Sequence, residues 1–118
     1  MLTIRNIDKI ANTHILGTEY HITRITTPIP ESYHMVIKSD TYNHYMRLVL
    51  SRVLEHNFVG EFYTLQLIDV ATGPTAVFPP MTYPSFGISP KDMKTPNEFM
   101  KSIEKYFKHL IVGNYLKT

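Results

Sequence analysis

Hydrophobic and polar residues alternate along two short segments near the start of the chain, Tyr20–Thr26 and Tyr33–Lys38. Alternation with a period of two residues is typical of a β-strand that buries one face. Pro28 and Pro30 separate the two segments and favour a turn between them. The pattern therefore predicts an antiparallel hairpin. If the pairing is regular and starts with Thr26 opposite Tyr33, one face carries the pairs Ile22–Ile37 and Arg24–Met35, and the other carries Thr23–Val36 and His21–Lys38.

A helical period follows in Thr41–His56, where apolar residues recur three or four positions apart. Asp40 precedes this segment and can cap a helix, because a carboxylate accepts the free N–H groups of the first turn. The pattern therefore predicts an amphipathic helix. Its apolar stripe is Tyr42, Tyr45, Met46, Val49, Leu50, Val53 and Leu54.

A second amphipathic helix is predicted near the end of the chain. Thr95-Pro96-Asn97-Glu98 is a capping box with proline at the first helical position, and Gly113 suits the residue that ends a helix. Between these limits the apolar stripe is Phe99, Met100, Ile103, Tyr106, Phe107, Leu110 and Ile111.

Between the two predicted helices, Glu61–Val70 and Thr75–Phe78 flank the compact turn Ala71–Pro74, which predicts a second hairpin. The expected order is then β-β-α-β-β-α. We expect a single α+β domain over residues 1–118, with a mainly antiparallel sheet of four to five strands and two amphipathic helices packed on one face.

The composition narrows the possible chemistry. The chain has 118 residues and no cysteine, which excludes a disulfide scaffold, cysteine-ligated metals and a thiol nucleophile. The first residues lack the apolar core of a secretory signal, and no apolar run is long enough to cross a bilayer. We therefore expect a cytoplasmic protein that does not bind a membrane. Scarce alanine and frequent Ile, Tyr, Lys and Asn suggest a gene of the phage or mobile-element kind.

Histidine is the abundant reactive side chain, but its spacing predicts no site. No two histidines stand at helical i, i+4 spacing, and His14 and His21 fall on opposite faces of a regular strand. Glu19 and His21 share a strand face, yet residues two apart on a strand are too distant for a working acid–base pair. The five glycines form no phosphate-binding loop. We therefore expect a non-enzymatic protein with no metal, no cofactor and no catalytic residues.

Apolar residues exceed what one core needs. Some lie on the second face of the strand Phe62–Val70, and others lie on a loop from Met81 to Ile88 that either folds over this face or binds a partner. Aromatic and Met side chains are typical of interface hot spots. The leading hypothesis is therefore a protein–protein interaction module, such as a small inhibitor or accessory factor, that binds another protein or a second copy of itself. The expected interface is Phe62, Ile68, Val70, Val77, Met81, Tyr83, Phe86 and Ile88.

Binding of single-stranded DNA or RNA is the alternative hypothesis. Residues 91–118 contain six lysines against three acidic residues, a local net charge of +3 within an overall net charge of +2. The many tyrosines and phenylalanines can stack on unpaired bases. The residues expected to contact nucleic acid are Arg47, Arg52, Lys101, Lys105 and Lys108.

Overall fold

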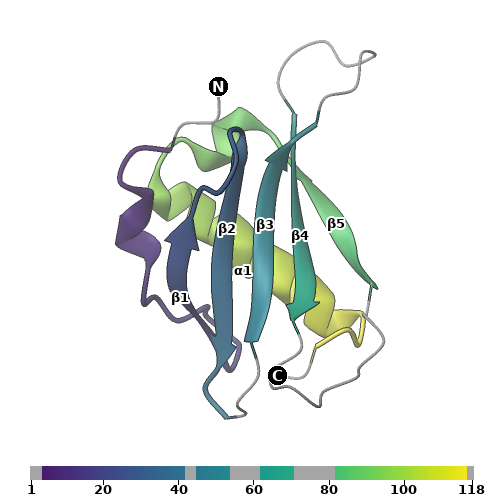
Figure 1. Cartoon of the computed structure of the whole chain (residues 1–118). Helices are drawn as coiled ribbons and strands as arrows, with labels where there is room; N and C mark the ends of the chain where they lie inside the picture. Colours follow the sequence, from purple (N-terminus) through teal and green to yellow (C-terminus); the bar gives the residue numbers. More distant parts are fainter. Residues whose placement is uncertain (1–3, 42–44, 54–61, 71–81, 117–118) are drawn as a thin grey trace.

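The computed structural model describes residues 4–41, 45–53, 62–70 and 82–116, and Figure 1 shows their arrangement. Five strands form one antiparallel sheet, in which the order across the sheet is the order along the chain. Two short 3-10 helices, η1 (Ile7–Ile10) and η2 (Pro90–Met93), and one α-helix, α1 (Pro96–Val112), complete the described elements. The strands are β1 (Tyr20–Thr26), β2 (Ser32–Ser39), β3 (Tyr45–Arg52), β4 (Tyr63–Val70) and β5 (Thr82–Ile88).

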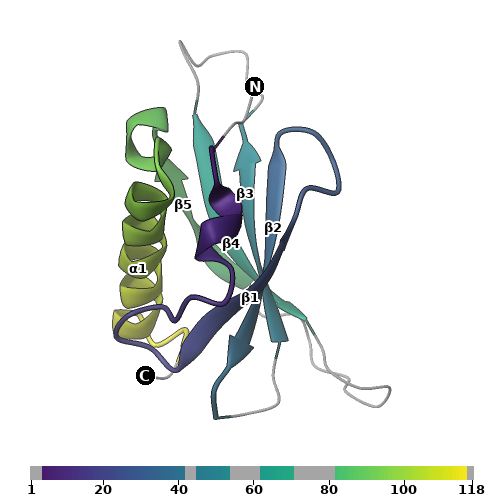
Figure 2. The ribbon, with the colours of Figure 1, turned by 90° about the vertical axis from the view of Figure 1, so that its left-hand side faces the viewer.

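Helix α1 lies across one face of the sheet (Figure 2). It begins after Thr95, whose hydroxyl oxygen accepts the N–H of Glu98 at 3.2 Å, and it ends at Gly113, as predicted. The predicted apolar stripe is buried except for Ile111, which is half-buried. The second predicted helix is therefore confirmed, and it closes the core.

The first predicted hairpin is also confirmed, with one change of register. His21 pairs with Lys38 and Ile22 with Ile37, but a β-bulge at Thr23 shifts the pairing that follows. Arg24 then faces Val36 instead of Met35, and Thr26 faces His34 instead of Tyr33. An extra residue in one strand turns the next side chain to the other face, so the bulge moves Arg24 away from the core.

The first predicted helix is wrong, because the described part of that segment is strand β3. Met46, Leu48 and Leu50 point to the core and are at most 1% exposed, while Arg47 on the opposite face is exposed. This is the period of a strand, and β3 pairs along its whole length with β2 and β4. Hydrogen bonding to two neighbours outweighs a helical pattern of side chains. The element order is therefore β-β-β-β-β-α, with one α-helix on the sheet in the described residues.

The loop expected from Met81 to Ile88 is also wrong, because strand β5 runs through most of it and pairs with β4. The strand contains Pro84, a residue that is rare inside a sheet. Proline is tolerated here because β5 is the edge of the sheet and its pairing is irregular between Gln66 and Ile68 of β4. The predicted partner strand Thr75–Phe78 lies outside the described residues.

Tyr106 connects the helix to the two last strands. Its phenol oxygen accepts the N–H of Leu67 at 2.9 Å and donates to the carbonyl of Pro84 at 2.6 Å. Burial raises the pKa of Tyr106 to about 12, so the phenol keeps the proton that the second bond needs. This pair of bonds fixes α1 against β4 and β5.

The segment before β1 runs antiparallel beside it. The N–H of Asn12 donates to the carbonyl of Ile22 at 2.6 Å, and the N–H of Ile15 donates to the carbonyl of Tyr20 at 2.9 Å. Gly17, with a φ of 78°, lies in the turn that reverses the chain between these partners. His14 and His21 consequently form an isolated β-bridge. No helix in the described part of the chain is long and apolar enough to span a membrane.

Candidate functional site

The sheet face opposite α1, here called the open face, carries no helix or strand in the described part of the chain (Figure 2). Register partners on adjacent strands place its side chains in three rows across the sheet. The first row is His14, His21, Lys38 and Tyr45; the second is Arg24, Val36, Arg47 and Ile68; the third is Thr26, His34, Val49 and Gln66.

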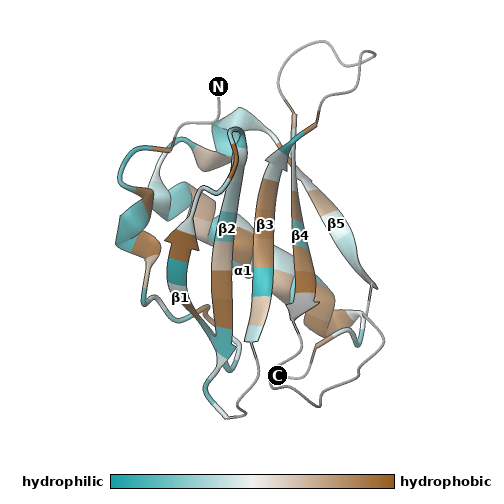
Figure 3. Cartoon of the chain, viewed as in Figure 1, coloured by the Kyte–Doolittle hydropathy of each residue, from teal (hydrophilic) through white to brown (hydrophobic). Residues whose placement is uncertain are grey.

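The charge of the open face is positive along its first three strands. Arg24, Lys38 and Arg47 stand on β1, β2 and β3, and these strands contain no aspartate or glutamate. In Figure 3, which views this face, hydrophilic bands interrupt the hydrophobic colouring of β1, β2 and β3. Because neighbouring strands lie about 5 Å apart, the two cations of the second row are separated by about two strand spacings.

Lys38 and Tyr45 are neighbours in the first row and contact each other. The ammonium nitrogen of Lys38 lies 5.6 Å from the centroid of the Tyr45 ring, within the range of a cation–π contact. Phe62 lies beside the same face at the other end of the sheet, where a Cβ on Gly87 would come within 2.5 Å of its ring. Glycine at position 87 therefore leaves the space that the Phe62 ring fills.

His34 connects the third row to a pair of serines. Its Nε2 lies 3.1 Å from the hydroxyl of Ser32, which lies 3.4 Å from the hydroxyl of Ser51. Burial and the nearby Arg47 guanidinium lower the pKa of His34 below its ordinary value of 6.5. The imidazole therefore favours its neutral form on this positively charged face.

His14 and His21 share one carboxylate at the end of the first row. Nδ1 of His21 lies 2.5 Å from Oδ1 of Asp40, and Nδ1 of His14 lies 3.2 Å from Oδ2. A regular strand over residues 14–21 would place the two histidines on opposite faces, as the sequence predicts. The turn at Gly17 instead makes them cross-strand partners on one face. No group of three or more metal-binding side chains is placed to hold a metal ion in the described residues.

The residues of the predicted protein interface do not form one surface. Tyr83 and Ile88 are buried beneath α1, and the ring of Phe86 lies between Tyr106 and His109 at centroid distances of 5.8 and 6.1 Å.

Phe62 and Ile68, also predicted for this interface, lie on the open face, where Ile68 is 45% exposed. Val77, Met81 and the side chain of Val70 lie outside the described part of the structure.

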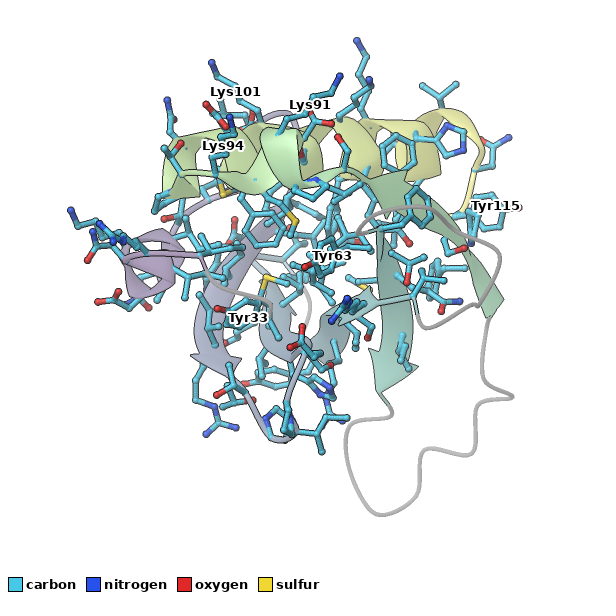
Figure 4. All side chains as sticks on the ribbon, turned by 90° about the horizontal axis from the view of Figure 1, so that it is seen from above. Tyr33, Tyr63, Lys91, Lys94, Lys101 and Tyr115 are labelled. Carbon is cyan, nitrogen blue, oxygen red and sulfur yellow. The ribbon has the colours of Figure 1, made fainter. Side chains whose placement is uncertain are left out.

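The residues of the predicted nucleic-acid site are also divided between the two sides of the molecule. Lys101 and Lys105 are exposed on α1 beside a shallow groove of about 560 Å³, and Lys108 contributes to a second groove of about 670 Å³ near Leu16. Figure 4 shows Lys91, Lys94 and Lys101 projecting from the helical layer away from the sheet. Arg47 lies on the open face, and Arg52 is half-buried at the end of β3.

Comparison of the chain with family models, with curated proteins and with solved structures finds no match.

Proposed function

We propose that the protein binds single-stranded nucleic acid across the open face. The observation that carries the proposal is the placement of Arg24, Lys38 and Arg47 on the same face as Tyr45, where the carboxylate of Asp40 is paired with His14 and His21 at the end of the first row. A sheet face with cations and an aromatic ring offers a polyanion its two main contacts, namely charge for the phosphates and a ring for the bases.

Tyr45 is the stacking platform of this proposal. The contact of its ring with Lys38 is worth about 0.5–1 kcal/mol at an exposed site, whereas a base stacked on an aromatic ring contributes about 1–3 kcal/mol. A base therefore displaces the ammonium group from the ring. Lys38 is then free to pair with the phosphate of the same nucleotide.

The bulge at Thr23 supports the same assignment. In a regular strand Arg24 would face the core with Ile22, where its charge would be costly to bury. The bulge turns it to the open face, two strand spacings from Arg47 in the second row. The cations thus come from two adjacent rows and can contact successive phosphates of one strand.

Two variants with matched charge changes test the location of the site. The first replaces the open-face cations (Arg24→Gln, Lys38→Gln, Arg47→Gln), and the second replaces three helix lysines (Lys101→Gln, Lys105→Gln, Lys108→Gln). Fluorescence anisotropy with a labelled DNA 20-mer at low salt measures the affinity. We expect the first variant to bind at least about tenfold more weakly than the wild type and the second to bind within about twofold of it. Equal losses, or no binding by the wild type, would overturn the proposal.

Substitutions of Tyr45 test the stacking contact separately. We expect Tyr45→Ala to weaken binding about tenfold, because one base–ring contact is lost, and Tyr45→Phe to bind like the wild type. An equal effect of both substitutions would mean that the hydroxyl, and not the ring face, makes the contact.

Binding of another protein stays a prediction for this face. Ile68 in the second row is a large exposed apolar side chain, and an acidic protein would meet the same three cations. A competition experiment tests whether the two partners share this face. Excess single-stranded DNA displaces a protein bound to the open face only if both use the same surface.

A further inference from the structure

The two histidines of the first row are held in a defined orientation. Asp40 approaches the Nδ1 atom of both His14 and His21 with its two carboxylate oxygens. When each Nδ1–H donates to Asp40, each Nε2 is the ring atom left to accept or release a proton. One carboxylate therefore sets the tautomer of two neighbouring imidazoles. The side chains of His14 and Asp40 are 49% and 44% exposed, so solvent and ligands reach this end of the row.

The histidines stand beside the proposed binding contacts. Lys38 is the register partner of both His21 and Tyr45, so His21, Lys38 and Tyr45 occupy three adjacent strands. The backbone of Lys38 is consequently about 5 Å from the backbone of each of them along the row, and the backbones of Tyr45 and His21 are about 10 Å apart. A nucleotide unit, from base through sugar to phosphate, covers this span. A base on Tyr45 places its phosphate at Lys38, next to the imidazoles.

We propose that His14 and His21 are an acid–base pair that cleaves RNA at a phosphodiester bound by Lys38. This inference rests on the proposed binding of single-stranded nucleic acid. In the step, the neutral imidazole of one histidine accepts the proton of the 2′-hydroxyl at Nε2 while the 2′-oxygen attacks phosphorus. The bond from phosphorus to the 5′-oxygen breaks, and the protonated imidazole of the other histidine donates its Nε2 proton to that oxygen.

The products are a 2′,3′-cyclic phosphate and a 5′-hydroxyl, and the two histidines have exchanged protonation states. The step consumes no co-reactant. Lys38 stabilises the negative charge that develops on the phosphoryl oxygens, and Asp40 is a positioning residue that holds both rings. The charged groups near the pair are Asp40, Lys38 and Glu19, whose backbone carbonyl accepts the N–H of Asp40.

The test uses a labelled RNA 12-mer and the same strand with a single ribonucleotide replaced by its 2′-deoxy form. We expect the full-length protein to cleave RNA to cyclic-phosphate products with a bell-shaped pH dependence, and to leave the 2′-deoxy linkage intact. His14→Gln and His21→Gln should each lower the rate about 100-fold or more. His109→Gln, on α1, should cleave like the wild type. Asp40→Asn should shift the pH–rate profile as well as lower the rate, since the amide nitrogen that replaces one carboxylate oxygen cannot accept an Nδ1–H.

Binding of an all-DNA strand, measured in parallel, shows whether each variant is folded and whether the proposed function holds. Strand binding with cleavage no faster than that of the His14→Gln/His21→Gln double variant, purified identically, would overturn this inference and leave the proposed function standing. Cleavage of the 2′-deoxy linkage would overturn the 2′-hydroxyl mechanism. Absence of strand binding by the wild type would overturn the proposed function itself.

Discussion

The surroundings of His34 on the open face change the pKa of its imidazole. Burial and the Arg47 guanidinium lower its pKa in the folded chain. Between this lowered pKa and 6.5, the ordinary pKa, the unfolded chain binds a proton at His34 that the folded chain does not bind. The free energy of unfolding therefore falls as the pH falls through that value. Above it His34 is neutral in both states and contributes no pH dependence.

We expect His34→Gln to reduce the loss of stability between about pH 7.5 and 5.5, measured by urea unfolding at each pH. In the wild type, NMR titration should place the midpoint of the His34 ring below its ordinary value. Arg47→Met should raise that midpoint, because it removes the nearby positive charge. An unchanged pH dependence in His34→Gln, together with an unshifted midpoint in Arg47→Met, would contradict this prediction.

The apolar residues in the segment of strand β3 fit the period of a helix as well as that of a strand. A helix over the same segment would place Val49 in the middle of its apolar stripe and Leu48 outside it. The strand instead buries Leu48 completely and leaves Val49 half-buried on the open face. We expect Leu48→Ala to lower the free energy of unfolding by about 2–5 kcal/mol and Val49→Ala to lower it by less than about 1 kcal/mol. Urea unfolding of both variants measures the two costs. The opposite ranking would favour the helix.

Local patterns predicted the elements whose stability is mostly local. The capping box and Gly113 defined α1 within the sequence, and the alternation around Pro28 and Pro30 defined the first hairpin. Strand β3 could not be predicted in this way, because its hydrogen-bond partners lie on two other strands. Its central position in the sheet is a property of the tertiary fold.

The candidate site was predicted only at the level of residue types. Arg47 and the abundance of tyrosine pointed to nucleic acid, but the bulge that turns Arg24 outward has no clear signal in the sequence. One feature of the sequence could have predicted the pairing of His14 with His21. Gly17 lies near the middle of the segment between them, and a glycine between two extended segments is typical of a turn.

At the scale of the whole molecule, the cations divide into two sets on opposite sides of the sheet. Binding through the open face uses the three cations of that side, so the logarithm of the affinity should fall with the logarithm of the salt concentration with a slope of about −2 for a single strand. Arg47→Gln should make the slope shallower by about 0.7, and Lys101→Gln should leave it unchanged. Anisotropy titrations at four salt concentrations measure it. Equal shallowing by both substitutions would place the strand on both sides of the molecule.

A different feature limits further strand pairing at each edge of the sheet. The backbone of residues 12–15 hydrogen-bonds to β1, and Pro84 removes a donor from β5 where the pairing is already irregular. Exposed edges are where sheets from separate chains join and aggregate. A binding partner that approached the described part of the sheet would therefore meet its face more readily than a pair of open edges.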